Sequence, residues 1–288
     1  MKCENFKCYC ETKKGPSNPM LHFKARLGRV NVALQGMKEL RPDELPVLTA
    51  KLLENYKEAT GNYSIQYTLF DWKEIREGLE ILPNFPDLEK YVFLYTCKTL
   101  EIPEDYTPEQ GEIELLFFNR IKAVETVTYH IVKSFTDVYG REDGIELYKE
   151  LVPYFVRDMK KKNPEKLPED PKTKTVHEMV EGAIKSWCDI GMADFAYCIL
   201  DDYRVIYRFD KCMIPEVLRK YNDPDLAYLA SCYIGDHPEW TKDRVIHMRR
   251  TQTLQHSEFC DEFYWNNLVY PDAEQPDLVF TAKIGKEM

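Results

Sequence analysis

The stretch DFAYCILDDYRVIYRF, residues 194–209, decides the fold class. Its side-chain pattern changes from the helical period of the preceding chain to a period of two, which is typical of β-strands. Asp201 and Asp202 separate the stretch into two halves of similar length. The stretch therefore predicts two neighbouring strands of an antiparallel sheet.

The chain before this strand pair has a helical pattern. Apolar residues recur every three to four positions in four segments, namely 45–60, 112–138, 143–161 and 175–188. Pro153 interrupts the third segment and predicts a kink or a split there. Residues 160–175 are polar and carry three prolines, which predicts a surface loop. Residues 1–20 look irregular.

The chain after the strand pair predicts two short helices and a second strand pair. The helices are expected at 214–222 and 224–235, and the strands at 243–254 and 259–269. Together the patterns predict an α+β fold, in which helices pack on a small antiparallel sheet. We expect a mainly helical N-terminal region of unknown role, residues 1–110, followed by an α+β domain, residues 111–288.

Composition narrows the class of protein. The net charge is −10 and no Lys/Arg run is long enough for a nucleic-acid groove, so we expect no nucleic-acid partner. No segment reaches the roughly 18 consecutive apolar residues of a membrane helix, and the N-terminus has no apolar signal region. We therefore expect a cytoplasmic protein without a membrane partner. Self-association stays open.

The nine cysteines are expected to be reduced thiols, because a cytoplasmic protein rarely keeps disulfides and the number is odd. Cys3, Cys8 and Cys10 have the spacing C-x4-C-x-C, which lacks the paired CxxC of a structural zinc site. We expect these three to lie in a mobile tail. His130 lies on an otherwise apolar helix face and is expected to be a core histidine with satisfied hydrogen bonds.

The second strand pair places Cys260 on a polar face. If residues 255–258 form its loop, Thr253 lies opposite Cys260, and side chains alternate between the two faces. One face then carries Arg249, Thr251, Thr253, Cys260, Glu262 and Tyr264. The other carries Met248, Arg250, Leu254, Phe259, Phe263 and Trp265, with Gln252 and Asp261 among them. The first face is open to water or forms the floor of a polar pocket.

Cys260 on such a face has two interpretations. Nearby arginines and His256 favour the thiolate, which is the reactive form, and His256 or His247 is a candidate proton acceptor. The other interpretation is a small buried hydrophobe. Cys212 and Cys232 are expected near Cys260, and three thiolates with His237 or Asp236 would suit zinc. No close-spaced pair supports zinc, so we expect no metal and no cofactor.

Five segments in a fixed order give the C-terminal half a resemblance to a known family. They are YGREDGIELYKEL (139–151), YRFDKC (207–212), IPEVLRKY (214–221), SCYIGD (231–236) and RTQTLQHSEFCDEFYW (250–265). In this order they resemble the L-2-amino-thiazoline-4-carboxylic acid hydrolase family over roughly residues 112–270. The likeness departs at His256-Ser257, where the family usually has Gly-Asp, and at Glu262, which interrupts the family's Cys-Asp-Phe.

The resemblance implies a hydrolase that opens a C–N bond in a small cyclic amidine or amide-like substrate bearing a carboxylate. The positions that match the family's characteristic residues are Cys212, Cys232, Asp236, Arg250, Thr251, Thr253 and Cys260. We expect Cys260 as the nucleophile or a thiol at the reacting centre, His256 as the base and Asp236 as the group that orients water or a partner. Arg249 or Arg250 would pair with the substrate carboxylate.

Two other functions stay open on the same scaffold. The C-terminal layout also resembles the 4-vinyl-reductase type of ligand-binding domain, which implies a small-molecule-binding sensory module. That domain holds zinc through cysteines, and one of those positions is Gln252 here. A lyase or isomerase is the third reading, because a fold does not determine the chemistry that it carries.

Overall fold

The computed structural model describes residues 1–286 and has 56% helix and 15% strand, which confirms the α+β class. The longer helices are α1 (Pro19–Leu40), α2 (Leu45–Thr60), α4 (Pro86–Leu100), α5 (Phe117–Tyr139), α6 (Arg141–Lys162) and α7 (His177–Ile190). The shorter ones are α3 (Trp72–Ile75), α8 (Met213–Leu218), α9 (Pro224–Ala230), α10 (Tyr233–Asp236), α11 (Pro238–Thr241) and α12 (Leu278–Lys283). No helix within residues 1–286 is long and apolar enough to cross a membrane.

The strands form two sheets. They are β1 (Lys2–Lys7), β2 (Lys14–Ser17), β3 (Ile113–Leu116), β4 (Ala193–Asp201), β5 (Arg204–Cys212), β6 (Ile246–Arg249) and β7 (Cys260–Asn266). The larger sheet is antiparallel with the order β1-β4-β5-β7-β6, and β2 pairs with β3 in a separate hairpin. The strand pair expected at 194–209 is confirmed as β4 and β5, which are paired antiparallel.

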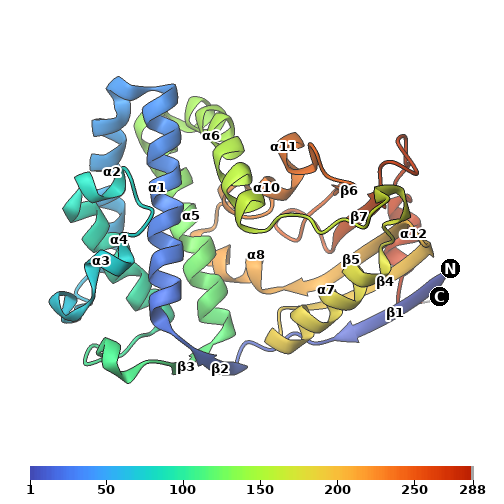
Figure 1. Cartoon of the computed structure of the whole chain (residues 1–288), viewed down its shortest axis with the longest axis horizontal. Helices are drawn as coiled ribbons and strands as arrows, with labels where there is room; N and C mark the ends of the chain where they lie inside the picture. Colours follow the sequence, from blue (N-terminus) through green and yellow to red (C-terminus); the bar gives the residue numbers. More distant parts are fainter. Residues whose placement is uncertain (287–288) are drawn as a thin grey trace.

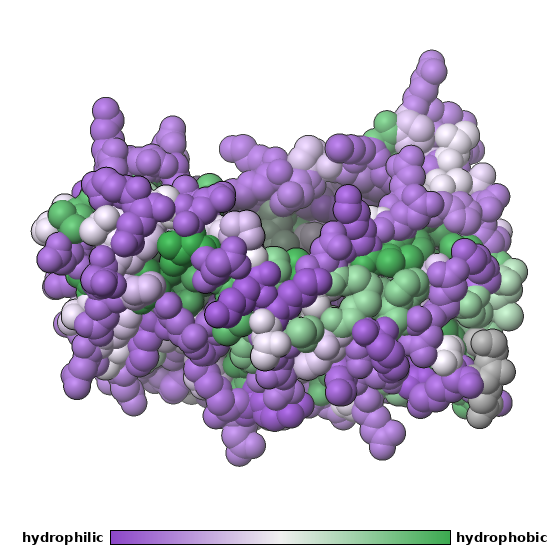
Figure 2. Space-filling view, turned by 90° about the horizontal axis from the view of Figure 1, so that it is seen from below, coloured by the Kyte–Doolittle hydropathy of each residue, from purple (hydrophilic) through white to green (hydrophobic). Residues whose placement is uncertain are grey.

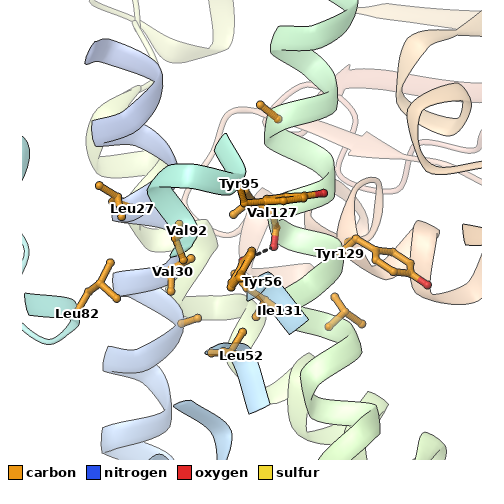
Figure 3. Packing of buried hydrophobic residues seen from close by; sticks show 14 of the residues in the cluster. Leu27, Val30, Leu52, Tyr56, Leu82, Val92, Tyr95, Val127, Tyr129 and Ile131 are labelled. Atoms are coloured by element: carbon orange, nitrogen blue, oxygen red, sulfur yellow. Dashed lines mark hydrogen bonds between the residues drawn. The ribbon is translucent and has the colours of Figure 1, made fainter. Parts of the chain in front are cut away.

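The helical part packs around one apolar core, beside the sheet (Figure 1). Helix α5 lies in its centre and contacts α1, α2, α4 and α6. Side chains at helical spacing, such as Val127 and Ile131 of α5, are fully buried against α1, α2 and α4 (Figure 3). The hydroxyl of Tyr56 donates to the carbonyl of Val127 over 2.9 Å, which satisfies the one polar atom of this ring.

Each face of the larger sheet has its own apolar cluster, because side chains alternate across a strand. Phe195, Tyr207 and Cys260 belong to the cluster under α7, which lies along that face in Figure 1. Their neighbours Ala196, Ile206, Phe263 and Trp265 belong to the opposite cluster, which Phe280 of α12 and Ile284 cover. The face under α7 is the one that carries the site described below.

The first twenty residues are regular, in contrast to our expectation. Strand β1 pairs with β4 and places Cys3 opposite Cys198. The structure contains the disulfides Cys3–Cys198 and Cys8–Cys188, so the expectation of reduced thiols is wrong for these four cysteines. The partners are 195 and 180 residues apart in sequence, and no local pattern reports such a pairing. The N-terminal strand also ties residues 2–7 to the C-terminal sheet.

The expected boundary at 110/111 stays a prediction, but one apolar core extends across it. The cluster of the helical part runs from Met20 to Ile234 and includes residues on both sides. Helix α6 contains Pro153 without being split. Figure 2 shows that one side of the molecule is mostly hydrophilic and hollowed near its middle, between the helical part and the sheet.

Candidate functional site

Three cysteines from separate elements line one cavity of about 260 Å³. Cys212 ends β5, Cys232 lies directly before α10, and Cys260 begins β7. The strand β7 pairs with β5, and the pairing places Cys260 opposite Phe209, close to the end of β5. We call this space the three-thiol cavity. It unites Cys212, Cys232, Cys260 and Arg250, four of the residues that the sequence analysis singled out.

The walls of the three-thiol cavity are largely apolar. Helices far apart in sequence contribute Met159 from α6, Trp187 from α7 and Trp240 from α11, and β6 contributes Met248. Trp187 also packs edge-on against Phe209, with 5.0 Å between the ring centroids. Arg250 and Glu262 are the charged members of the lining. A molecule in this cavity therefore meets mainly carbon and sulfur.

The thiols of the cavity are in their neutral form at neutral pH. Cys260 is 8% exposed, and burial raises its pKa well above the usual value, although Arg250 acts in the opposite direction. Burial also raises the pKa of Cys212 and of Cys232. The expectation of a lowered pKa for Cys260 is wrong, because the cost of burying a thiolate exceeds the attraction of one guanidinium.

Arg250 is bound by the protein's own carboxylates. Its Nη1 donates to both carboxylate oxygens of Asp236 over 3.0 Å, and its Nη2 donates to Glu262 over 2.5 Å. Tyr228 donates to Asp236 over 2.9 Å and Tyr264 donates to Glu262 over 2.7 Å. The side chain of Arg250 is 7% exposed, so the pairs are shielded from water. One guanidinium between two carboxylates leaves the group with a formal charge of −1.

The two arginines exchange the faces that we expected for them. In β6 and β7, Arg249 lies opposite Phe263, whereas a four-residue loop would place it opposite Tyr264. Strand β6 ends at Arg249, and residues 250–259 form an irregular connection. A shift of one residue moves a side chain to the other face of the sheet. Arg249 consequently lies over the Trp265 ring on the far face, 5.2 Å from its centroid.

His256 is not among the residues that line the three-thiol cavity. Its Nε2 lies 3.1 Å from a carboxylate oxygen of the exposed Asp225, and its Nδ1 lies 3.4 Å from the Thr253 hydroxyl. The structure therefore gives His256 no contact with Cys260, and the role of base for this thiol has no support.

The two threonines and Asp236 have structural partners. The Thr251 amide donates to Asp261 over 3.0 Å, and its hydroxyl donates to the same carboxylate over 2.5 Å. Thr253 is buried, and its carbonyl accepts from the amides of His256 and Ser257. Both threonines thus shape the connection between β6 and β7. Asp236 holds Arg250 and is not itself part of the cavity lining.

Glu262 and Gln255 belong to the site but were not among the site residues expected from the sequence. Glu262 follows Cys260 by two positions, so strand alternation alone places both on one face. The Gln255 amide donates to the Ser231 hydroxyl over 3.1 Å and to Cys232 Sγ over 3.5 Å. No sequence signal connects Gln255 to Cys232, because the contact depends on how the irregular connection packs on α10.

Neither a group of metal-binding side chains among residues 1–286 nor a match to a known protein indicates which reaction or ligand the site serves. Within residues 1–286, no group of three or more His, Cys, Asp and Glu side chains is placed to hold a metal ion, so the zinc alternative gains no support. No protein-family model, curated protein or solved structure matches the chain. The function is therefore argued from the geometry of the site.

Proposed function

We propose that this protein binds a small, neutral or cationic molecule in the three-thiol cavity. The observation that carries the proposal is a largely apolar cavity of about 260 Å³ whose one guanidinium, Arg250, is already paired with Asp236 and Glu262. The volume suits roughly nine non-hydrogen atoms, since a water molecule occupies about 30 Å³ in the liquid. Apolar walls with a few placed polar groups are typical of ligand sites.

The charge of the cavity selects against an anionic ligand. A substrate carboxylate would add negative charge beside Glu262, and both terminal nitrogens of Arg250 already donate to carboxylates. Within residues 1–286 only its buried Nε lacks a partner. An amidinium or another planar cation would instead find the carboxylate of Glu262. We therefore expect a cyclic amidine without a carboxylate to bind more tightly than the same ring that bears one.

Thiol labelling in the presence of ligands tests this proposal. Neutral and cationic cyclic amidines are screened by thermal unfolding of the full chain. Each compound that binds is then tested for protection of Cys212, Cys232 and Cys260 against a thiol reagent. Cys10 is the internal control, because it does not line the cavity and a hydrogen bond with Thr12 lowers its pKa. We expect protection of the cavity thiols and unchanged labelling of Cys10.

Two results contradict binding in the three-thiol cavity. The first is a ligand that raises the unfolding temperature without slowing the labelling of the three cavity thiols. The second is carboxylate-bearing rings that bind at least as tightly as their neutral analogues, because the charge argument around Arg250 then fails. Cys97→Ala serves as a matched variant, since Cys97 is a buried thiol of α4 outside this cavity.

A hydrolase of the kind implied by the family resemblance is the second candidate. It is favoured by the convergence of Cys212, Cys232, Cys260 and Arg250 in one cavity, with Glu262 two residues from Cys260. In this reaction Cys260 Sγ forms a bond to the amidine carbon and its proton passes to Glu262. Glu262 then gives this proton to the departing nitrogen as the C–N bond breaks. Water later cleaves the C–S bond, which restores the Cys260 thiol.

Product formation from a cyclic amidine separates hydrolysis from binding alone. Cys260→Ser and Glu262→Gln are each expected to reduce turnover by about 100-fold or more, the usual scale for a lost acid–base group. His256→Gln is the matched control and is expected to keep wild-type turnover, because His256 does not line the cavity. Ligand binding without turnover by the wild type would remove the hydrolase and leave the binding protein.

A further inference from the structure

A second cavity, of about 510 Å³, lies in the helical part between α2, α4, α5 and the 3-10 helix Arg219–Tyr221. It shares no lining residue with the three-thiol cavity. Its walls carry Lys98, Lys122, Lys133 and Lys220, and Glu58 is the carboxylate among its lining residues. We call it the lysine cavity. Such a gathering of positive charge is notable in a chain with a net charge of −10.

Three of the four ammonium groups have no acidic partner, and two of these three make no hydrogen bond among the described residues. Lys133 donates to Asp137 over 2.7 Å, and Lys98 donates to the carbonyls that end α2. The side chain of Lys122 makes no hydrogen bond or ion pair within the described chain. Lys220 lies 4.8 Å from the centroid of the Tyr221 ring. Burial, Lys122 and Lys98 lower the pKa of Lys220, so these positive charges destabilise one another.

His130 adds a buried, unpaired nitrogen to the same cavity. It is 6% exposed, and its Nε2 lies 3.4 Å from the Tyr221 hydroxyl, but Nδ1 has no partner in residues 1–286. The expectation of a satisfied core histidine is therefore wrong. Burial lowers the pKa of His130 to about 3, so the ring is neutral. An unpaired buried polar atom is costly, and this one belongs to a residue that lines the cavity.

Aromatic rings form another wall of the lysine cavity. The rings of Tyr129 and Tyr221 are stacked, with 3.8 Å between their centroids and 10° between their planes. The Tyr221 hydroxyl lies 3.2 Å from the Tyr95 hydroxyl. Figure 3 shows Tyr129, which also belongs to the buried cluster of the helical part, on the side of α5 that faces away from α1. The cavity thus combines unpaired cations with a flat aromatic surface.

We infer that the lysine cavity binds a small phosphorylated molecule, with its phosphate groups on Lys122 and Lys220. Phosphate supplies several negative charges and acceptor oxygens, and lysine is a common point-charge partner for it. A cavity of about 510 Å³ is larger than one phosphate needs, so the remainder of the molecule occupies the space beside Tyr129 and Tyr221. This site is independent of the proposed binding in the three-thiol cavity.

Calorimetric titration of the full chain with inorganic pyrophosphate at fixed ionic strength tests the site. The variants are Lys122→Gln and Lys220→Gln, and the control is Lys149→Gln, which removes the same charge from α6 outside the cavity. Saturable binding at one site per chain is expected for the wild type and the control. Each cavity variant is expected to bind about tenfold more weakly, the scale of one lost charge-assisted hydrogen bond.

Three results overturn the inference. They are no saturable binding of pyrophosphate, an equal loss in all three variants, and unchanged binding in both cavity variants. An equal loss would mean that pyrophosphate responds only to net charge. Lys122 and Lys220 are partly or fully exposed, so the variants are expected to fold, which circular dichroism and thermal unfolding check. As a second readout, pyrophosphate should raise the unfolding temperature of the wild type and the control more than that of either cavity variant.

Discussion

The three-thiol cavity and the lysine cavity differ in how their charges are balanced. In the first, Arg250 is held by Asp236 and Glu262, so the protein itself supplies the counter-charge. In the second, Lys122 and Lys220 have no carboxylate partner among the described residues. The difference teaches that the presence of a cation in a cavity does not predict an anionic ligand. The charge that remains in the cavity after internal pairing determines which ligand charge the cavity favours.

Helix α5 carries both kinds of environment. Lys122, His130 and Lys133 line the lysine cavity. Glu125 of the same helix is buried, and burial raises its pKa although Arg29 and Arg26 act in the opposite direction. The helix thus presents unpaired positive charge in one direction and a buried carboxyl group in the other.

The largest expected effect comes from removing Arg250. Arg250→Met leaves Asp236 and Glu262 without their cation, and breaking a buried ion pair in this way costs roughly 3–5 kcal/mol. Arg249→Met is the matched control. Arg249 is exposed and lies over the Trp265 ring, so its loss should cost about 1 kcal/mol or less. Denaturant unfolding at pH 7 measures both. Equal losses would contradict the internal pairing of Arg250.

A smaller effect is expected at Glu125, and it depends on pH. Burial raises the pKa of Glu125 to about 7 from an ordinary value of 4.5. A raised carboxyl pKa stabilises the fold at low pH, and this contribution is lost as the pH rises from about 4.5 through 7. The neutral side chain of Glu125→Gln does not titrate, so the variant does not lose this contribution. Its free energy of unfolding should exceed that of the wild type at pH 8 by on the order of 1–3 kcal/mol, and should equal that of the wild type near pH 4.5.

Unfolding free energies at several pH values between 4.5 and 8 measure this difference. The exposed Glu112 provides the control, and Glu112→Gln should follow the wild type at every pH. A stability advantage of Glu125→Gln that does not change with pH would show that its charge is fully balanced by Arg26 and Arg29. That result would contradict the raised pKa of Glu125 and the cost of burying its carboxylate.

Local periodicity was sufficient for much of the fold. The period of two in 194–209 predicted β4 and β5, and the helical spacing of 45–60 predicted α2 with its end at Gly61. Helix α1 and strand β1 were not anticipated. Residues 2–7 form a strand only because β4, some 190 residues later, offers an edge to pair with. A pairing of that range leaves no trace in the local pattern.

The sequence predicted several residues of the site, but it did not predict how they are arranged. The order of motifs brought Cys212, Cys232 and Cys260 into one site, and the structure places them in one cavity. The predictions were wrong for the pKa of Cys260 and for the sheet faces on which Arg249 and Arg250 lie. Both depend on tertiary facts, namely how deeply β7 is covered by α7 and where β6 ends. The spacing of residues along the chain predicts neither how deeply a side chain is buried nor a one-residue shift in strand register.

The smallest expected effect is at Lys122, and its sign is the sharpest test of the comparison. If the lysine cavity holds unbalanced positive charge, removing one ammonium group should stabilise the empty protein. Interactions between exposed charges are worth about 0.2–1 kcal/mol. The free energy of unfolding of Lys122→Gln should therefore exceed that of the wild type by a few tenths of a kcal/mol at low salt. Added salt screens charges that are partly exposed, so the gain should shrink at 1 M, where the screening length is about 3 Å. Lys133→Gln supplies the opposite case, because Lys133 is paired with Asp137 and the loss of this pair should destabilise the protein slightly.

A Lys122→Gln variant less stable than the wild type at low salt would mean that Lys122 already has a counter-charge. The lysine cavity would then be balanced internally, as the three-thiol cavity is, and would hold no charge for a phosphate.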